Sequence, residues 1–111
     1  MSKLVLLSKL VLFLCCTAAS IPAQETRGSL TGRISDPSGA VIPGVRVLAQ
    51  SAGTGVKTET KTNHEGVYQL PYLLPGNYRV TAEAQGFKTQ FRSKIELRIN
   101  DRLELNFKMD V

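Results

Sequence analysis

The stretch that decides the fold is residues 62–87, which reads TNHEGVYQLPYLLPGNYRVTAEAQGF. Asn63 and Gly66 mark a tight turn, because both residue types tolerate the positive φ that such turns need. Residues 78–85 then alternate apolar and polar side chains, which is the period of a strand with one buried face. Residues 67–70 form a shorter strand, and Pro71 is expected to end it, since proline has no N–H to donate to a ladder.

The rest of the chain supplies similar strands. We predict them at residues 28–35, 45–50, 56–62, 91–99 and 103–109. With 67–70 and 78–85 they make seven short strands separated by turns such as Asp36-Pro37-Ser38-Gly39, and no convincing helix follows residue 23. This pattern predicts an all-β fold, a seven-stranded antiparallel Greek-key β-sandwich. Gly32, on the inner face of the first strand, indicates either a close approach of another backbone or a bulge.

The predicted core consists of the apolar side chains on the inner faces of these strands. It holds Leu30, Ile34, Val45, Val47, Tyr68, Leu70, Tyr78, Val80, Ala82, Phe87, Ile95, Leu97, Leu103, Leu105 and Phe107.

The first 23 residues differ from the rest. Lys3 and Lys9 lie beside an apolar run that ends at Cys16, and small residues follow up to Ala23. This is the layout of a secretory signal peptide, so we divide the chain into a signal peptide at 1–23 and one domain at 24–111. A transmembrane anchor and a lipoprotein cleavage site are the alternatives, and cleavage after Ser20 competes with cleavage after Ala23. The protein is therefore expected to be exported.

Charge gives no reason to expect nucleic acid as a partner. Lys3 and Lys9 account for two of the 14 basic residues, which leaves 12 against 9 acidic residues, a net charge of +3. The remaining charges are interleaved with one another, whereas nucleic-acid binding needs clustered basic residues and stacking aromatics.

Catalytic chemistry is expected to be absent. His64 is the only histidine, and Cys15 and Cys16 both lie in the signal peptide. A catalytic zinc site takes three protein ligands, commonly two or three of them histidines. Oxygen-bearing side chains occur at Asp36, Asn63, Glu65 and Asp101, but most fall at turns where such side chains bond the backbone. We therefore expect no enzyme activity, no metal and no cofactor.

Two stretches are candidate binding sites. Tyr72, between Pro71 and Pro75, is the best exposed aromatic candidate for a ligand contact, for example with carbohydrate. The strand at 56–62 is the candidate edge for the addition of a peptide strand, through Val56, Thr58, Thr60 and Thr62. Its Lys57 and Lys61 suit an exposed edge and are expected to tune such pairing rather than forbid it.

Two segments resemble a known family. Residues 28–47, GSLTGRISDPSGAVIPGVRV, and 60–89, TKTNHEGVYQLPYLLPGNYRVTAEAQGFKT, resemble the carboxypeptidase regulatory-like domain, over almost the whole of 28–109. Asn63 stands where this family often has Asp. The resemblance implies a transthyretin-like sandwich of seven strands without catalytic residues of its own.

The signal peptide ahead of such a domain is similar to the start of TonB-dependent, Oar-like outer-membrane receptors. This implies a periplasmic N-terminal extension of a receptor, or a stand-alone version of it, located in the periplasm or at the outer membrane, or secreted. The expected partner is a protein at the outer membrane or a receptor barrel. A carbohydrate-binding module and an adhesion or spacer module remain alternatives.

Overall fold

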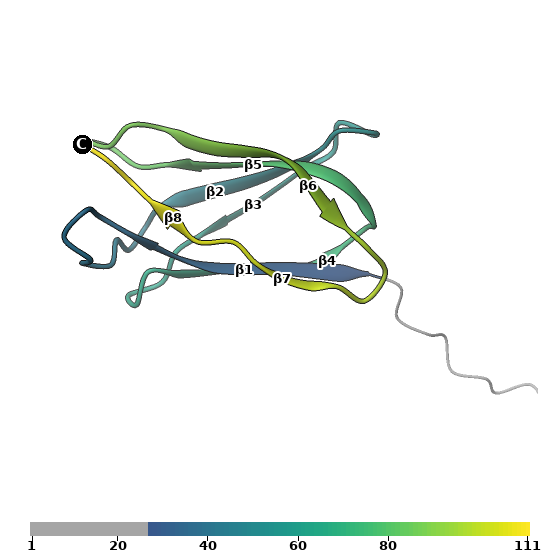
Figure 1. The fold of residues 1–111 in the computed structure, drawn as a ribbon, viewed down its shortest axis with the longest axis horizontal. Coiled ribbons are helices and arrows are strands. Elements are labelled where there is room, and N and C mark those ends of the chain that lie inside the picture. The colour runs from purple at the N-terminus through teal and green to yellow at the C-terminus, as the bar shows by residue number, and fades with distance from the viewer. Residues whose placement is uncertain (1–26) are drawn as a thin grey trace, which may run out of the picture.

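The computed structural model describes residues 27–111, so the predicted signal peptide at 1–23 lies outside the described residues. Over this range the chain forms eight strands in two sheets that pack face to face (Figure 1). One sheet has the order β4-β1-β7, with β8 also paired to β1, and the other has the order β3-β2-β5-β6. The strands are β1 Gly28–Ser35, β2 Arg46–Ser51, β3 Lys57–Lys61, β4 Val67–Leu73, β5 Gly76–Glu83, β6 Gln90–Leu97, β7 Arg102–Glu104 and β8 Phe107–Lys108. The described part of the chain contains no helix long and apolar enough to cross a membrane.

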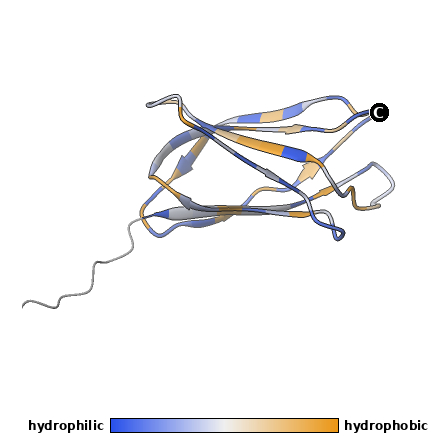
Figure 2. Ribbon diagram, turned by 180° about the vertical axis from the view of Figure 1, so that it is seen from behind, coloured by the Kyte–Doolittle hydropathy of each residue, from blue (hydrophilic) through white to orange (hydrophobic). Residues whose placement is uncertain are grey.

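Apolar side chains alternate with polar ones along the strands, as the hydropathy colouring of Figure 2 shows, and the apolar ones meet between the sheets. Most of the predicted core is confirmed as buried: Leu30, Ile34, Val45, Val47, Tyr68, Leu70, Tyr78, Val80, Ala82, Leu97, Leu105 and Phe107. Phe87, Ile95 and Leu103 only pack against its margin. Ala49, Leu73 and Met109 are buried although the predicted core did not include them.

The predicted last strand, 103–109, is divided into β7 and β8, which raises the strand count from seven to eight. Both halves run parallel to β1, so the prediction of a wholly antiparallel sandwich was wrong at this edge. At the break, the N–H of Arg33 donates to the side-chain Oδ1 of Asn106 at 2.8 Å, in place of a backbone carbonyl. The side-chain alternation continues through the break, since Leu105, Phe107 and Met109 all face the core.

Tyr68 of β4 links β1 to the segment between β7 and β8. Its ring is buried and its hydroxyl donates a hydrogen bond to the backbone carbonyl of Leu105. The ring reaches that carbonyl by passing over Gly32 of β1, where an added Cβ would lie 1.9 Å from the Leu105 oxygen and 2.8 Å from the ring. Of the two alternatives for Gly32, the close backbone approach is therefore confirmed. Burial raises the pKa of Tyr68, which keeps the hydroxyl protonated as a donor.

The ends of three predicted strands were wrong. β5 runs over Gly76–Glu83 and not over 78–85. Pro71 does not end β4, which continues to Leu73 through an irregularity in its pairing with β1. β6 ends at Leu97, so Ile99 lies in the following turn with 61% of its surface exposed. The apolar character of Ile99 continued the strand pattern in the sequence, but Asp101 closes a turn there by accepting the N–H of Arg98 at 2.8 Å.

The predicted turns have the expected chemistry. Asp36 Oδ1 accepts the N–H groups of Ser38 and Ala40 at 2.9 and 3.0 Å, and Asn63 Oδ1 accepts those of Glu65 and Val67 at 2.9 and 3.0 Å. The hydrogen bond from the Ser38 hydroxyl, followed by those from the backbone, lowers the pKa of the Asp36 carboxyl. These two turns lie at the end of the sandwich opposite the start of β1.

The close packing at Gly32 generates a prediction about stability. Gly32→Ala should lower the free energy of unfolding by about 1–3 kcal/mol or more, because the new methyl group overlaps the Leu105 carbonyl and displaces the Tyr68 ring. Urea unfolding measures the change. Gly53→Ala is the matched control, since nothing lies within 4 Å of its added Cβ. Equal losses in the two variants would contradict the assigned contact.

Candidate functional site

Tyr72 is carried on a β-bulge of β4. On β1 only Ser29 lies opposite the two residues Pro71 and Tyr72, so the register shifts at this point. The extra residue allows Leu70 and Leu73 both to point into the core although they are three positions apart. A bulge of this kind re-aims a side chain, and here it turns the Tyr72 ring outward.

The backbone at Tyr72 is strained. Its φ is 60°, a value that costs a non-glycine residue about 1–3 kcal/mol. The ring recovers little of this by burial, because 68% of Tyr72 is exposed. Its carbonyl accepts a long hydrogen bond of 3.4 Å from the guanidinium of Arg27. Exposure agrees with the sequence prediction, while a ligand contact at Tyr72 stays a prediction.

Tyr72 separates two hollows at the end of the sandwich where β1 begins. One, of about 610 Å³, lies over the outer face of the β4-β1-β7 sheet, and its lining includes the polar side chains of Thr31, Gln69 and Arg102. The other, of about 260 Å³, is lined by Tyr72 together with Val56 and Thr58. The structure thus brings the predicted ligand contact beside the first residues of the predicted edge, a proximity that the sequence did not indicate.

Three exposed apolar side chains line the smaller hollow, and we call them the apolar end. They are Val56, Tyr72 and Leu74, which are 59%, 68% and 55% exposed. Tyr78 holds the turn that carries Leu74 in place, because its hydroxyl donates a hydrogen bond to the Leu74 carbonyl at 2.5 Å. Burial raises the pKa of Tyr78, so this donor stays protonated in neutral solution.

β3 forms one edge of its sheet, and its backbone groups alternate in direction. The N–H of Ser51 donates to the carbonyl of Val56 at 2.9 Å, which makes these residues a hydrogen-bonded pair. In an antiparallel ladder such pairs recur every second residue, so Thr58 and Thr60 also direct their N–H and C=O groups toward β2. The groups that point away from the sheet belong to Lys57, Glu59 and Lys61.

The hydrogen-bond pattern of β3 differs from what the predicted edge residues implied. Val56, Thr58 and Thr60 are placed along the edge, but the outward backbone groups are those of the residues between them. Thr62 lies beyond the end of β3 and is buried, with its hydroxyl donating to the Ile42 carbonyl at 2.8 Å and accepting the N–H of Val45 at 2.9 Å. Thr62 therefore fixes a loop and does not belong to the open edge.

The opposite edge of the same sheet, β6, is interrupted. Lys94 has a φ of 59°, and the pairing with β5 shifts register beside it. Arg92 lies opposite Val80, on the inner face, with its guanidinium carbon 5.5 Å from the centre of the Phe107 ring. Bulges and inward-facing charges are devices that stop an edge from pairing with another strand.

The edges of the other sheet are interrupted as well. β4 contains Pro71 and the Tyr72 bulge, and the β7–β8 edge is divided into strands of three and two residues. β3 differs from all three, because its five residues pair with β2 in continuous register and include no bulge, proline or positive φ. Among the edge strands of residues 27–111, β3 is therefore the one without such an interruption.

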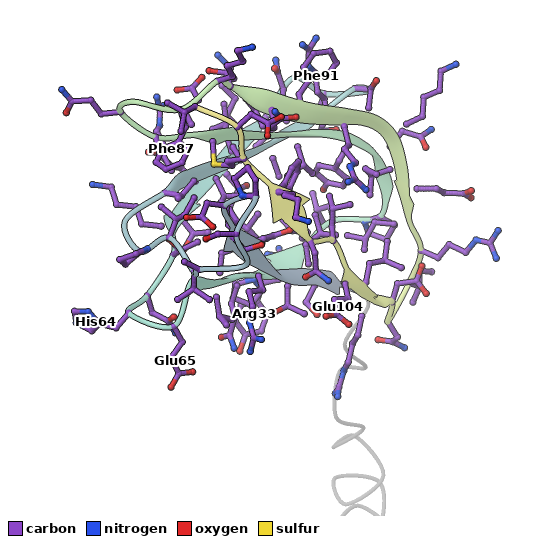
Figure 3. The ribbon with its side chains drawn as sticks, turned by 60° about the vertical axis from the view of Figure 1, so that its left-hand side comes forward. Arg33, His64, Glu65, Phe87, Phe91 and Glu104 are labelled. Atoms are coloured by element: carbon purple, nitrogen blue, oxygen red, sulfur yellow. The ribbon has the colours of Figure 1, made fainter. Side chains whose placement is uncertain are left out.

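The residues considered for chemistry lie on different parts of the sandwich and do not form one group. Figure 3 shows His64 and Glu65 projecting from one turn away from the body of the sandwich, while Arg33 and Glu104 lie on the outer face of one sheet and Phe91 on that of the other. Within residues 27–111, no three His, Cys, Asp or Glu side chains gather closely enough to hold a metal ion together. The side-chain oxygens of Asp36 and Asn63 already accept backbone N–H groups.

These features define a transthyretin-like β-sandwich with an open edge and an apolar end. Residues 29–110 match the carboxypeptidase regulatory-like domain, and the chain belongs to this family. It is also similar to a TonB-dependent transporter, Oar, of Myxococcus xanthus, with 34% identity over 65 residues. That alignment covers 59% of this chain and 6% of the transporter, so the chain matches a small part of that protein's length.

Solved structures with the same fold come from proteins of several kinds. The Bacillus anthracis TIE protein aligns with a TM-score of 0.62 and 20% identity, over 77% of this chain and 16% of that one. A putative carbohydrate binding protein from Bacteroides uniformis aligns with a TM-score of 0.59 and 18% identity, over 76% of this chain and 41% of that one. A 3-chlorocatechol 1,2-dioxygenase from Rhodococcus opacus aligns with a TM-score of 0.61 and 8% identity, over 79% of this chain and 61% of that one. At these identities the likeness shows the fold alone.

The strain at Tyr72 can be measured. Tyr72→Gly should leave the free energy of unfolding unchanged or raise it, because glycine adopts a φ of 60° without steric cost and little buried surface is lost. Tyr72→Val should lower it by about 1–2 kcal/mol, because a β-branched residue suits this conformation least. Thermal unfolding of both variants tests this, and a Tyr72→Gly protein much less stable than Tyr72→Val would contradict it.

Proposed function

We propose that this chain is a non-catalytic accessory module of the cell envelope that binds a protein partner through β3, as the periplasmic N-terminal extension of a TonB-dependent receptor. The single observation that carries this proposal is the contrast among the four edges. Three are interrupted, whereas β3 presents outward backbone groups at Lys57, Glu59 and Lys61. An extended segment that adds to such an edge gains main-chain hydrogen bonds along its whole length.

The apolar end supports the same role. Exposed apolar side chains grouped at one place mark interaction sites more often than scattered ones do. Val56 directly precedes β3, and Tyr72 and Leu74 line the hollow beside it. A partner that pairs with β3 can therefore also cover these side chains.

The receptor assignment rests on similarity to the Oar transporter and on the family, which also supports a location in the envelope. The absence of catalysis is proposed from the residues, since His64 stands in an exposed turn where no assembled group of catalytic side chains surrounds it within the described range. Export through the predicted signal peptide belongs to the same proposal.

Carbohydrate binding is the second candidate, and one observation favours it. Tyr72 is exposed in a strained conformation beside the larger hollow, where Thr31, Gln69 and Arg102 supply polar groups. An aromatic ring next to hydrogen-bonding side chains can hold a sugar ring. The likeness to the Bacteroides protein adds only that the fold is shared.

Photo-crosslinking in the cell that makes the protein tests the main proposal. With p-benzoylphenylalanine in place of Glu59, light should join the chain to an envelope protein, because this position stands on the open edge. The same probe at Arg33, exposed on the outer face of the other sheet, should give no such adduct and is the control. A titration with soluble glycans followed by NMR tests the second candidate. Saturable shifts around Tyr72 that Tyr72→Ala abolishes, without an adduct at Glu59, would put carbohydrate binding first.

A further inference from the structure

We propose that the segment bound by β3 is an extended acidic peptide, added as an antiparallel strand, with two carboxylates four residues apart and an apolar residue directly after the second. In one-letter code this pattern is [DE]-x-x-x-[DE]-Φ, where Φ is apolar. The inference rests on the proposed function and names the chemistry of its partner.

The backbone sets the register of the added strand. Because the N–H and C=O groups of Lys57, Glu59 and Lys61 point outward, each of these residues forms a hydrogen-bonded pair with one residue of the partner. The partner residues opposite Lys57 and Lys61 are then four positions apart, and their side chains lie on the same outer face as the two lysines.

Charge selects the side chains at those two positions. Within residues 27–111, neither Lys57 nor Lys61 takes part in an ion pair. Glu59 between them is already engaged, since Arg46 Nε lies 2.5 Å from its carboxylate and Arg46 also reaches Glu83 at 3.5 Å. The outer face of β3 therefore presents two uncompensated positive charges, and opposite charges facing each other across strands attract.

The same arrangement disfavours a second copy of this chain as the occupant. In the antiparallel register that pairs the whole of β3 with its copy, Lys57 faces Lys61 and Glu59 faces Glu59. Every outer-face pair then has like charges, which destabilises cross-strand pairing. An acidic partner meets no such penalty at either lysine.

The apolar residue follows from the hollow at the apolar end. In an antiparallel partner, the residue after the one facing Lys57 lies opposite Val56. Its side chain is on the inner face, which at this point opens into the hollow of about 260 Å³ lined by Val56, Thr58, Tyr72 and Leu74. One apolar side chain there covers surface that is otherwise exposed to water.

A blocked peptide of sequence TEVTVELT is the probe, and TKVTVKLT is its charge-reversed control. The acidic peptide should bind the purified protein and shift the amide NMR signals of Lys57, Glu59 and Lys61. The double variant Lys57→Glu/Lys61→Glu should bind it at least about tenfold more weakly, because two attractive cross-strand pairs become repulsive. That variant should instead prefer the lysine peptide. Lys88→Glu/Lys108→Glu makes the same change in net charge away from β3 and should leave the affinity unchanged.

Four results would overturn the inference. Equal affinity of the wild-type protein for both peptides would show that Lys57 and Lys61 do not distinguish acidic from basic side chains. Changes in amide NMR signals that centre on β6 or on the larger hollow would show that the peptide does not bind at β3. A dimer in sedimentation that the acidic peptide does not dissociate would show that a second copy occupies β3. Absence of peptide binding together with a protein adduct at Glu59 would reject the acidic pattern and leave the proposed function standing.

Discussion

The structure depends most on the contact between the Tyr68 ring, Gly32 and the Leu105 carbonyl. The ring crosses β1 at Gly32, an inner-face position without a side chain, and its hydroxyl bonds a carbonyl that the break between β7 and β8 leaves without a backbone partner. A buried carbonyl left unpaired costs about 1–3 kcal/mol. The Asn106 side chain bonds the other side of the break. Together these contacts let a divided strand close the sheet.

The way each sheet ends determines what the molecule can bind. The break between β7 and β8 and the bulges at Tyr72 and Lys94 interrupt three edges, and each interruption removes a template for pairing. β3 keeps a regular edge, and its charges oppose pairing with its own copy while leaving an acidic partner acceptable. The bulge at Tyr72 also places an aromatic ring beside the start of β3. The open edge and the apolar end are thus two consequences of how the strands terminate.

Much of the fold could be predicted from period-two alternation, which gave the correct facing of residues such as Ile34 and Val80. The bulges could not be predicted, because Tyr72 and Lys94 adopt a positive φ that their residue types do not signal. The abundance of Thr and charged residues in 56–62 indicated the exposed edge. Which of its backbone groups point outward depends on the pairing with β2, and the burial of Thr62 depends on a loop from elsewhere in the chain. The sequence therefore indicated the exposed edge strand but not its hydrogen-bonding register.

Hydrogen–deuterium exchange of the β3 amides tests the central claim most directly. In the isolated protein the amides of Thr58 and Thr60, bonded to β2, should exchange slowly, and those of Lys57, Glu59 and Lys61 should exchange quickly. Envelope membranes that contain the partner identified by crosslinking are then added. The amides of Lys57, Glu59 and Lys61 should become protected from exchange, while the exchange rates of the β6 amides should not change. Protection of the outward amides in the isolated protein, or fast exchange that persists with the partner bound, would contradict the account.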